Sequence, residues 1–378
     1  MAKGETPEGY EGWGFPGLDA VGRPMRRGYT LPETSAIARG NSMGYVRWAV
    51  LFCFAACLSV AVGAASDAVL RFSLPPVLEA LPIAFAQEWG LFTEHGVEVE
   101  LVGISDNLQR SAALMTGNLD GLMSDVTHAV LDASAGSDLV LTAALASQPQ
   151  TGSVALALLS PVAFRIHSLE QLLSSSQLIG VLYRSDYEYM LDGLVERAPN
   201  GAEKTARYSS FNDMLQLATM FGAQWLGSAV LPEPYISYIA TYVPPSGAPL
   251  EMVTLDDFGE TDIPPSVILF RQRVIEERPD DVAAFHAAIE EAIERLNNTE
   301  REDLVESGLD VAVGLFFQAA DTSLIGQDVL DAISVPTYLP MEALPAEQYN
   351  GLVDWMKRKG YVLEPPAYDG FVDFQFLQ

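Results

Sequence analysis

The residues best suited to bind a small molecule stand directly after segments with a strand-like pattern. In open α/β sheets, ligands bind beyond the carboxyl ends of the strands, next to helix N-termini that present free N–H groups and a positive dipole end. This placement predicts as ligand-binding candidates Pro75, Pro76, Glu79, Ser124, Asp125, Gln148, Thr151, Gly152, Tyr183, Arg184, Ser185, Tyr187, Glu233 and Tyr235. Their chemistry is hydrogen bonding, ion pairing and stacking, which is the chemistry of binding.

Several of these polar candidates have an alternative structural role. Ser124 and Ser185 stand where helix N-caps are expected. For Asp125, the alternative to ligand binding is that it merely complements a helix dipole. Glu233 lies in a Pro-Glu-Pro-Tyr segment and could hold a hinge instead of touching a ligand. Both interpretations stay open for each residue.

The aromatic candidates and Arg184 also allow two interpretations. Tyr183, Tyr187 and Tyr235 could stack on a flat ligand, although tyrosines at strand ends also serve in packing. The planar fork of Arg184 suits a carboxylate or a sulfonate, with a plain surface position as the alternative. Trp225 precedes a strand-like segment, and we expect it in the core.

Neither the cysteines nor the histidines predict a metal site. Cys53 and Cys57 lie in one short apolar run, which excludes a zinc site built on four ligands of the Cys₄ or Cys₂His₂ type. No metal-like spacing connects the four histidines, which are His95, His128, His167 and His286. We expect structural or surface roles for them, no metal and no cofactor.

The charge of the chain restricts its partners. Lys and Arg total 21 against 50 for Asp and Glu, a formal net charge of -29. Such a surface repels phosphate backbones and anionic membranes, so we expect neither nucleic acid nor an anionic membrane surface as a partner. The shortage of basic residues also favours a neutral, aromatic or cationic ligand over nitrate, sulfonate or phosphate, although helix N-termini alone can bind anions.

The N-terminal part predicts export. Arg47 precedes an apolar run over residues 48–62 and small residues at 63–65, the pattern of a secretory signal peptide over residues 43–65. The run is shorter than the roughly 20 apolar residues that a spanning helix needs, although an uncleaved anchor remains an alternative. Residues 1–42 are interpreted as a disordered leader or a start-site artefact. An imperfect lipobox before Cys57 leaves lipid attachment open, so the protein is expected to be periplasmic or otherwise extracytoplasmic, free or lipid-anchored.

After the export segment, strand-like and helix-like segments alternate, which predicts an α/β fold with largely parallel sheets. We expect a first lobe over residues 66–155, a second lobe over 156–253 and a return to the first lobe with C-terminal helices over 254–378. A long helix is predicted over residues 280–297, because its apolar residues recur on one face: Val282, Phe285, Ile289, Ile293 and Leu296.

Six short motifs in order then resemble a known family. Pro82, Ala86, Gly90, Phe92 and Gly96 follow the pattern P-x-x-x-A-x-x-x-G-x-F-x-x-x-G, and residues 117–121 follow G-x-L-D-G. Residues 168–181, 232–235, 353–360 and 368–372 fit the later motifs, with Gln171 in place of the usual Asp and a glycine missing near residues 174–176. The chain resembles the substrate-binding proteins of ABC importers in the NMT1/THI5-like and sulfonate/nitrate/taurine-binding superfamily.

This resemblance covers nearly all of the exported part and implies a type II periplasmic-binding-protein fold. In that fold, two α/β lobes are joined by two crossovers and close on a ligand by a hinge. The implied partners are a small-molecule ligand, a membrane permease and its cytoplasmic ATPase subunit, and we expect a monomer. The resemblance does not fix the ligand.

Three functions compete at this point. The first is a receptor that delivers a small organic molecule to an ABC importer without catalysis, and we expect no enzyme. The second is a sensory ligand-binding module, free or membrane-anchored. The third is a pyrimidine-synthesis enzyme like those in the same superfamily. The resemblance implies that such an enzyme uses a cysteine-rich motif, and this chain has no cysteine after Cys57.

Overall fold

The computed structural model describes residues 69–198, 206–241, 250–259, 263–317 and 326–377. The predicted leader, the predicted signal peptide and Cys57 lie outside these residues. Within them, no helix is both long and apolar enough to cross a membrane.

The first sheet has five strands in the order β2-β1-β3-β11-β4. β1 is parallel to β2 and β3, whereas β11 is antiparallel to both β3 and β4. The strands are β1 (Leu70–Leu74), β2 (Val99–Gly103), β3 (Gly121–Ser124), β4 (Leu139–Leu145) and β11 (Ser266–Arg271). Strand β11 therefore returns from the second half of the chain and enters the middle of the first sheet.

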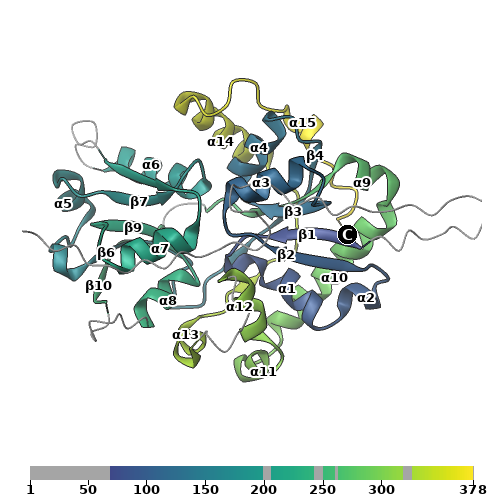
Figure 1. The fold of residues 1–378 in the computed structure, drawn as a ribbon, viewed down its shortest axis with the longest axis horizontal. Helices are drawn as coiled ribbons and strands as arrows, with labels where there is room; N and C mark the ends of the chain where they lie inside the picture. Colours follow the sequence, from purple (N-terminus) through teal and green to yellow (C-terminus); the bar gives the residue numbers. More distant parts are fainter. Residues whose placement is uncertain (1–68, 199–205, 242–249, 260–262, 318–325, 378) are drawn as a thin grey trace, which may run out of the picture. The chain divides into compact units, whose positions relative to one another are not determined.

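Helices cover both faces of the first sheet (Figure 1). One face packs against η1 (Leu78–Ala80), α1 (Leu81–Glu88), α2 (Leu91–Glu94), α9 (Gln272–Glu277), α10 (Pro279–Asn297), α11 (Arg301–Glu306), α12 (Leu309–Phe316) and α13 (Gln327–Ala332). The other face packs against α3 (Asn107–Met115), α4 (Val126–Ser134), α14 (Ala346–Lys359) and α15 (Tyr368–Phe371). The predicted apolar face of α10 is confirmed, since its five residues are all buried.

The second sheet repeats this plan. Its order is β10-β6-β9-β7-β8, from β6 (Leu156–Pro161), β7 (Ile179–Leu182), β8 (Tyr208–Phe211), β9 (Ser228–Pro232) and β10 (Met252–Asp256). β6 is antiparallel to both β9 and β10, whereas β7 is parallel to β8 and β9. In each sheet, the strand that is antiparallel to both of its neighbours is β11 or β6. Each of them is the first strand after the chain arrives from the other sheet. Strand β10 extends past the boundary at residue 253 that the sequence predicts for the second lobe.

Helices also cover both faces of the second sheet, and two of them begin at the predicted caps. One core contains α7 (Met214–Gly222) and α8 (Tyr235–Thr241), and the other contains α5 (Leu169–Ser174) and α6 (Asp186–Arg197). The side chain of Ser168 accepts a hydrogen bond from the Gln171 N–H, and that of Ser185 accepts one from the Glu188 N–H. Outside the two sheets, η2 (Val162–Phe164) follows β6, and β5 (Ser147–Gln148), in the passage from β4 to β6, pairs with β12 (Thr337–Tyr338).

One prediction from the apolar pattern is wrong, and one helix buries a face that its apolar residues do not mark. Trp225 is 72 % exposed instead of lying in the core, because it falls in the turn before β9 begins at Ser228. In α3, Leu108 and Met115 are more than half exposed, and the buried face carries Asn107, Arg110 and Leu114. An apolar stripe predicts the buried face only when that face is apolar, and the buried face of α3 is largely polar.

Gly121 marks the tightest point of the first sheet, where β3 pairs with Phe72 on one side and Phe270 on the other. A Cβ atom on Gly121 would lie 2.6 Å from the carbonyl oxygen of Leu269 and 2.7 Å from the ring of Phe270. We expect Gly121→Ala to destabilise the protein by about 1–3 kcal/mol through overpacking, as measured by chemical denaturation. Gly370→Ala is the matched control, because no atom lies within 4 Å of its added Cβ. Equal denaturation midpoints for the two variants would contradict the prediction.

Candidate functional site

Residues from the strand ends of both sheets line two neighbouring cavities. The larger cavity, of about 80 Å³, includes Glu79 and Asp125 from the first lobe and Asp186 and Tyr187 from the second. The smaller cavity, of about 40 Å³, contains Arg110 and shares Asp125, Tyr187 and Ser266 with the larger one. Because a water molecule needs about 10–15 Å³ of such space, the two cavities suit a ligand of several non-hydrogen atoms.

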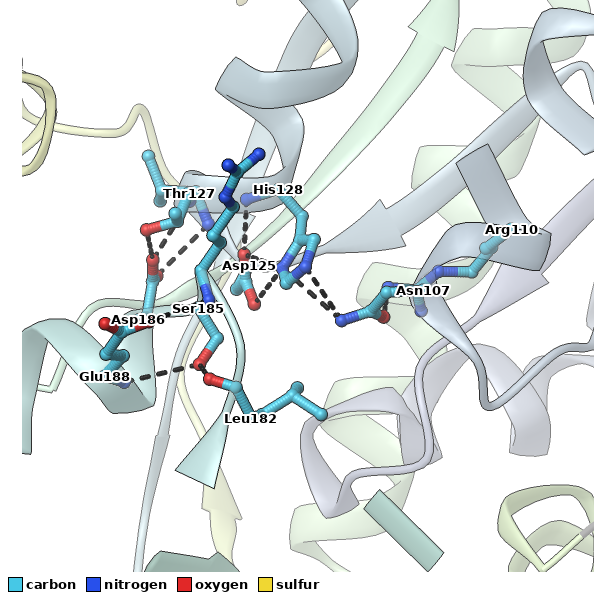
Figure 2. Close-up of polar contacts among 11 residues, drawn as sticks. Asn107, Arg110, Asp125, Thr127, His128, Leu182, Ser185, Asp186 and Glu188 are labelled. Carbon is cyan, nitrogen blue, oxygen red and sulfur yellow. Dashed lines mark hydrogen bonds and ion pairs between the residues drawn. The ribbon is translucent and has the colours of Figure 1, made fainter. Parts of the chain in front are cut away.

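Two helix N-termini meet at this site, and one of them receives a carboxylate from the other lobe (Figure 2). Asp186, the first residue of α6, accepts hydrogen bonds from the backbone N–H of Val126 at 3.1 Å and of Thr127 at 2.9 Å. The Thr127 hydroxyl also donates to Asp186. Asp186 therefore occupies the place at the positive end of α4 where an anion would otherwise bind.

Asp125 forms the N-cap of α4 and begins a chain of polar contacts (Figure 2). Its carboxylate accepts from the backbone N–H of His128 at 2.6 Å and lies 2.9 Å from His128 Nδ1. His128 Nε2 lies 2.9 Å from Asn107 Nδ2, and Asn107 Oδ1 accepts from Arg110 Nη2 at 2.8 Å. The chain therefore runs from a carboxylate through an imidazole and an amide to a guanidinium.

The donor and acceptor roles in this chain follow from its last member. A guanidinium can only donate, so the oxygen of Asn107 must face Arg110 and its amide nitrogen must face His128. In this arrangement His128 Nε2 accepts, and the ring carries its proton on Nδ1, toward Asp125. Burial lowers the pKa of His128, but the Asp125 carboxylate raises it more, so the net pKa lies above its ordinary value.

Arg110 is a buried cation with unused hydrogen-bonding capacity. It is 4 % exposed, and its Nη1 has no hydrogen-bond partner among the described residues. Burial lowers the pKa of Arg110, and the carboxylates of Asp125 and Asp132 oppose that effect. An unpaired buried donor costs free energy, so this nitrogen favours a ligand or water that brings an acceptor.

The carboxylates of the larger cavity are held away from their ordinary ionisation. Burial raises the pKa of Glu79, whose Oε1 accepts a hydrogen bond from the Ser147 hydroxyl at 3.4 Å. Burial and the charge of Asp125 raise the pKa of Asp186 to about 7. Burial, followed by the charges of Glu79, Asp125 and Asp186, raises the pKa of the Tyr187 hydroxyl far above its ordinary range. Among the described residues that line this cavity, Glu79 and Asp186 therefore have no cation beside them, whereas Asp125 pairs with His128.

The structure brings some of the predicted candidates together at these cavities. Those that line them are Pro75, Pro76, Glu79, Asp125 and Tyr187. Glu233 lines a smaller void of about 10 Å³ beside Glu79, and it accepts hydrogen bonds from the N–H and hydroxyl of Ser237. The ligand-binding roles of these residues stay predictions.

Other candidates lie away from the two cavities. Ser124 is buried at the end of β3 and does not cap α4, because Asp125 does. Ser185 is buried as the cap of α6, and Tyr235 is buried in the core with its hydroxyl on the Phe316 carbonyl. Gln148 ends β5, and Thr151 and Gly152 follow it; all three residues are exposed.

Tyr183 and Arg184 line a separate, larger hollow of about 700 Å³ between α3, α4 and the segment after α14. The Arg184 guanidinium carbon lies 4.9 Å from the ring centres of both Tyr183 and Tyr361. Tyr361 in turn donates a hydrogen bond to Glu188 at 2.6 Å. These contacts account for Tyr183 and Arg184 as parts of a link between α6 and the C-terminal segment.

Sequence analysis missed Asn107 and Arg110. Both lie on the buried face of α3, three positions apart, so a single turn brings them together. The signal in the sequence is that Arg110 stands four residues before Leu114 and so shares its helical face. A charged residue on that face is unusual in a helix that packs on a sheet. The exposed leucine and methionine of the same helix concealed it.

The histidines have structural partners or lie at the surface. His286 is buried, with Nδ1 2.8 Å from the Val282 carbonyl oxygen, and burial lowers its pKa to about 4. His95 lies 2.8 Å from Glu291, and His167 is exposed. Within the part of the chain that the structure describes, no group of three or more His, Cys, Asp or Glu side chains could hold a metal ion.

Comparisons with known proteins agree with this geometry. A family model described as "NMT1/THI5 like" matches residues 78–160. The alkanesulfonate-binding protein SsuA from Xanthomonas axonopodis pv. citri bound to MOPS superposes with a TM-score of 0.63 at 14 % identity, over 81 % of this chain and 98 % of that one. The chain has the type II periplasmic-binding-protein fold. No curated protein matches its sequence.

Two further solved structures have this binding-protein fold. The ligand-binding component of an ABC-type import system from Staphylococcus aureus, with zinc bound, gives a TM-score of 0.61 at 15 % identity, over 82 % of this chain and 97 % of that one. The periplasmic nitrate-binding protein NrtA from Synechocystis PCC 6803 gives 0.56 at 11 % identity, over 80 % of this chain and 83 % of that one. These structural neighbours are described as binding proteins, and at such identities the likeness establishes the fold alone.

Proposed function

We propose that the protein is an extracytoplasmic solute-binding receptor, which presents a small organic molecule unchanged to the permease and ATPase of an ABC importer. One observation carries this proposal. Side chains from the strand ends of two sheets with the same strand order line the same two cavities. The descriptions of the structural neighbours as import-system and periplasmic binding proteins support the role and the compartment.

We propose a hinge mechanism. Two passages connect the sheets, one between β4 and β6 and the other between β10 and β11. Direct contacts between the lobes surround the cavities, among them Asp186 on α4 and the N–H of Asn107 on the carbonyl oxygen of Asn212. A ligand enclosed there would touch both lobes, so its binding would favour the closed arrangement over an open one.

The receptor role predicts that one class of small molecule stabilises the protein. Residues 66–378 are heated with vitamin precursors, flavins, aromatic acids, sulfonates, nitrate, polyamines and amino acids in turn. A ligand at 100 times its dissociation constant adds about 2.7 kcal/mol to the free energy of unfolding, which raises the midpoint by several degrees.

Recovery of the bound compound distinguishes a receptor from an enzyme. The ligand that raises the midpoint is released by denaturation and analysed by mass spectrometry. A receptor returns it with its mass and amount unchanged. Conversion of the compound, or no stabilisation by any member of the panel, would count against the proposal.

A further inference from the structure

Three carboxylates border the larger cavity, of which Asp125 already pairs with His128. Glu79, Asp125 and Asp186 line it, and its lining within the described residues contains no lysine, arginine or histidine. Buried carboxylates without a cation are destabilised, because burial removes the water that solvates their charge. A ligand that brings a positive group to this cavity would therefore supply the cation that these carboxylates lack.

The neighbouring cavity has the opposite requirement. Arg110 lines it and is almost fully buried, with Nη2 bonded to Asn107 and Nη1 without a partner in the described part of the protein. A guanidinium nitrogen can only donate, so it accepts an oxygen of the ligand as its partner, best of all a charged one. The other candidate for an anion, the N-terminus of α4, already receives the carboxylate of Asp186.

Both requirements meet at one place. The two cavities share Asp125, Tyr187 and Ser266, so the carboxylate side and the guanidinium side adjoin the same wall. With about 80 and about 40 Å³, they have room for a compact molecule only. Charges of opposite sign at adjoining ends of a small site select a ligand that carries both charges at a short separation.

We propose that the ligand is a small zwitterion, in which a cationic nitrogen group is joined by a short spacer to an oxyanion. The cationic group faces Glu79 and Asp186, and the oxyanion faces Arg110. This inference rests on the proposed receptor function and specifies its ligand class. Carboxylates and sulfonates both supply the oxyanion, and the test separates them.

The first test uses the unaltered protein, residues 66–378, and isothermal titration calorimetry. The probes are glycine, β-alanine, 4-aminobutyrate, taurine and glycine betaine, each compared with the amine and the acid that carry one of its charges. We expect one zwitterion to bind on the order of 100-fold more tightly than either singly charged analogue. Equal binding of an amine or an acid alone, or no binding by any zwitterion, would overturn the inference. Binding of a neutral compound from the broader panel would then keep the receptor function and remove only the ligand class.

The second test assigns the two ends of the ligand. Arg110→Gln is expected to weaken zwitterion binding on the order of 100-fold without weakening the matched amine. Arg273→Gln is the control, because Arg273 is an exposed arginine of α9 outside both cavities. Equal effects of Arg110→Gln on the zwitterion and the amine would contradict the assignment. Glu79→Gln provides a second variant and should weaken the amine as well.

The pH dependence of binding gives a third readout. Glu79 faces Tyr187, Tyr338 and Ser147, and Asp186 faces Asp125, Tyr187 and Thr127. Arg110 and His128 lie behind Asp125. Burial raises the pKa of both carboxylates in the free protein, that of Asp186 to about 7, so a cationic group must displace the proton that Asp186 holds below about pH 7. Zwitterion affinity should therefore rise by up to tenfold per pH unit from pH 5 to 7, with proton release seen in buffers of different ionisation enthalpy. Affinity that falls or stays flat over this range would contradict the placement of the cation.

Discussion

Asp186→Asn is expected to stabilise the protein by an amount that grows between about pH 4 and 7 and is largest above pH 7. Asparagine is neutral like the protonated acid, and its single oxygen can keep one of the two hydrogen bonds that the Val126 and Thr127 N–H groups donate to separate oxygens of Asp186. It removes a charge that burial and Asp125 make unfavourable. The gain should therefore grow with pH over the range in which the unfolded chain has ionised Asp186 and the folded protein has not.

The sign and size of this effect follow from the shifted pKa. Burial and Asp125 raise the pKa of Asp186 from 3.8 to about 7, so between these values the folded protein holds a proton that the unfolded chain has released. Stability from this group falls as the pH rises through that window and is lowest above it. At about 1.4 kcal/mol for each pKa unit the ceiling is about 4 kcal/mol, and we expect roughly 2 kcal/mol at pH 8.

Chemical denaturation at pH 5, 6, 7 and 8 measures the difference between Asp186→Asn and the natural protein. Asp138→Asn serves as the control, because Asp138 is nearly half exposed and pairs with Arg271 at the surface. The control difference should stay small and nearly constant. A difference for Asp186→Asn that does not grow with pH would contradict the assignment of an ionised, unfavourably buried Asp186.

Phe285→Ala is expected to cost about 3–5 kcal/mol, the largest single loss predicted for this protein. Phe285 is fully buried in α10, and its ring centre lies 4.6 Å from that of Phe72 and 5.0 Å from that of Phe92. Phe270 lies edge-on to it at 5.2 Å. Four aromatic rings, one each from β1, α2, β11 and α10, thus fill the space between α10 and the first sheet, and alanine would leave a void among them.

Two comparisons test this prediction by chemical denaturation. Leu363→Ala removes an apolar side chain that is 88 % exposed, and it should change stability by less than about 0.5 kcal/mol. Phe285→Leu keeps most of the volume and should cost clearly less than Phe285→Ala. A loss below 1 kcal/mol for Phe285→Ala would show that the aromatic cluster is not central to the folded state.

The sequence allowed prediction of those features that depend on local pattern. The apolar periodicity of α10 and the capping serines of α5 and α6 are visible within one turn of chain. The rule that ligands bind at strand ends also led to Glu79, Asp125 and Tyr187, which line the cavities. Each of these predictions needs only neighbours in sequence or the general geometry of α/β sheets.

Features that depend on distant segments were beyond sequence reasoning. The carboxylate of Asp186 reaches α4 from the other lobe, about sixty residues away along the chain. Arg110 was overlooked because burial of a polar helix face becomes visible only when its partners, such as Asn107 and Asp125, are placed. Tyr183 and Arg184 are predicted ligand contacts that line another hollow. There the Arg184 guanidinium lies over the rings of Tyr183 and of Tyr361, which is close to the C-terminus.

The order of strands in the first sheet makes the second lobe an insertion into a single hairpin. Leu145 at the end of β4 and Ser266 at the start of β11 are cross-strand partners, although more than a hundred residues separate them. A turn of two to five residues is enough to join two such antiparallel strands. The chain thus leaves the first lobe after β4 and returns to it at the neighbouring position in β11. The second lobe is therefore a module that could be exchanged between these two points. Recognition chemistry carried by Asp186 and Tyr187 could then be changed by replacing one uninterrupted stretch of sequence, without redesign of the sheet that receives it.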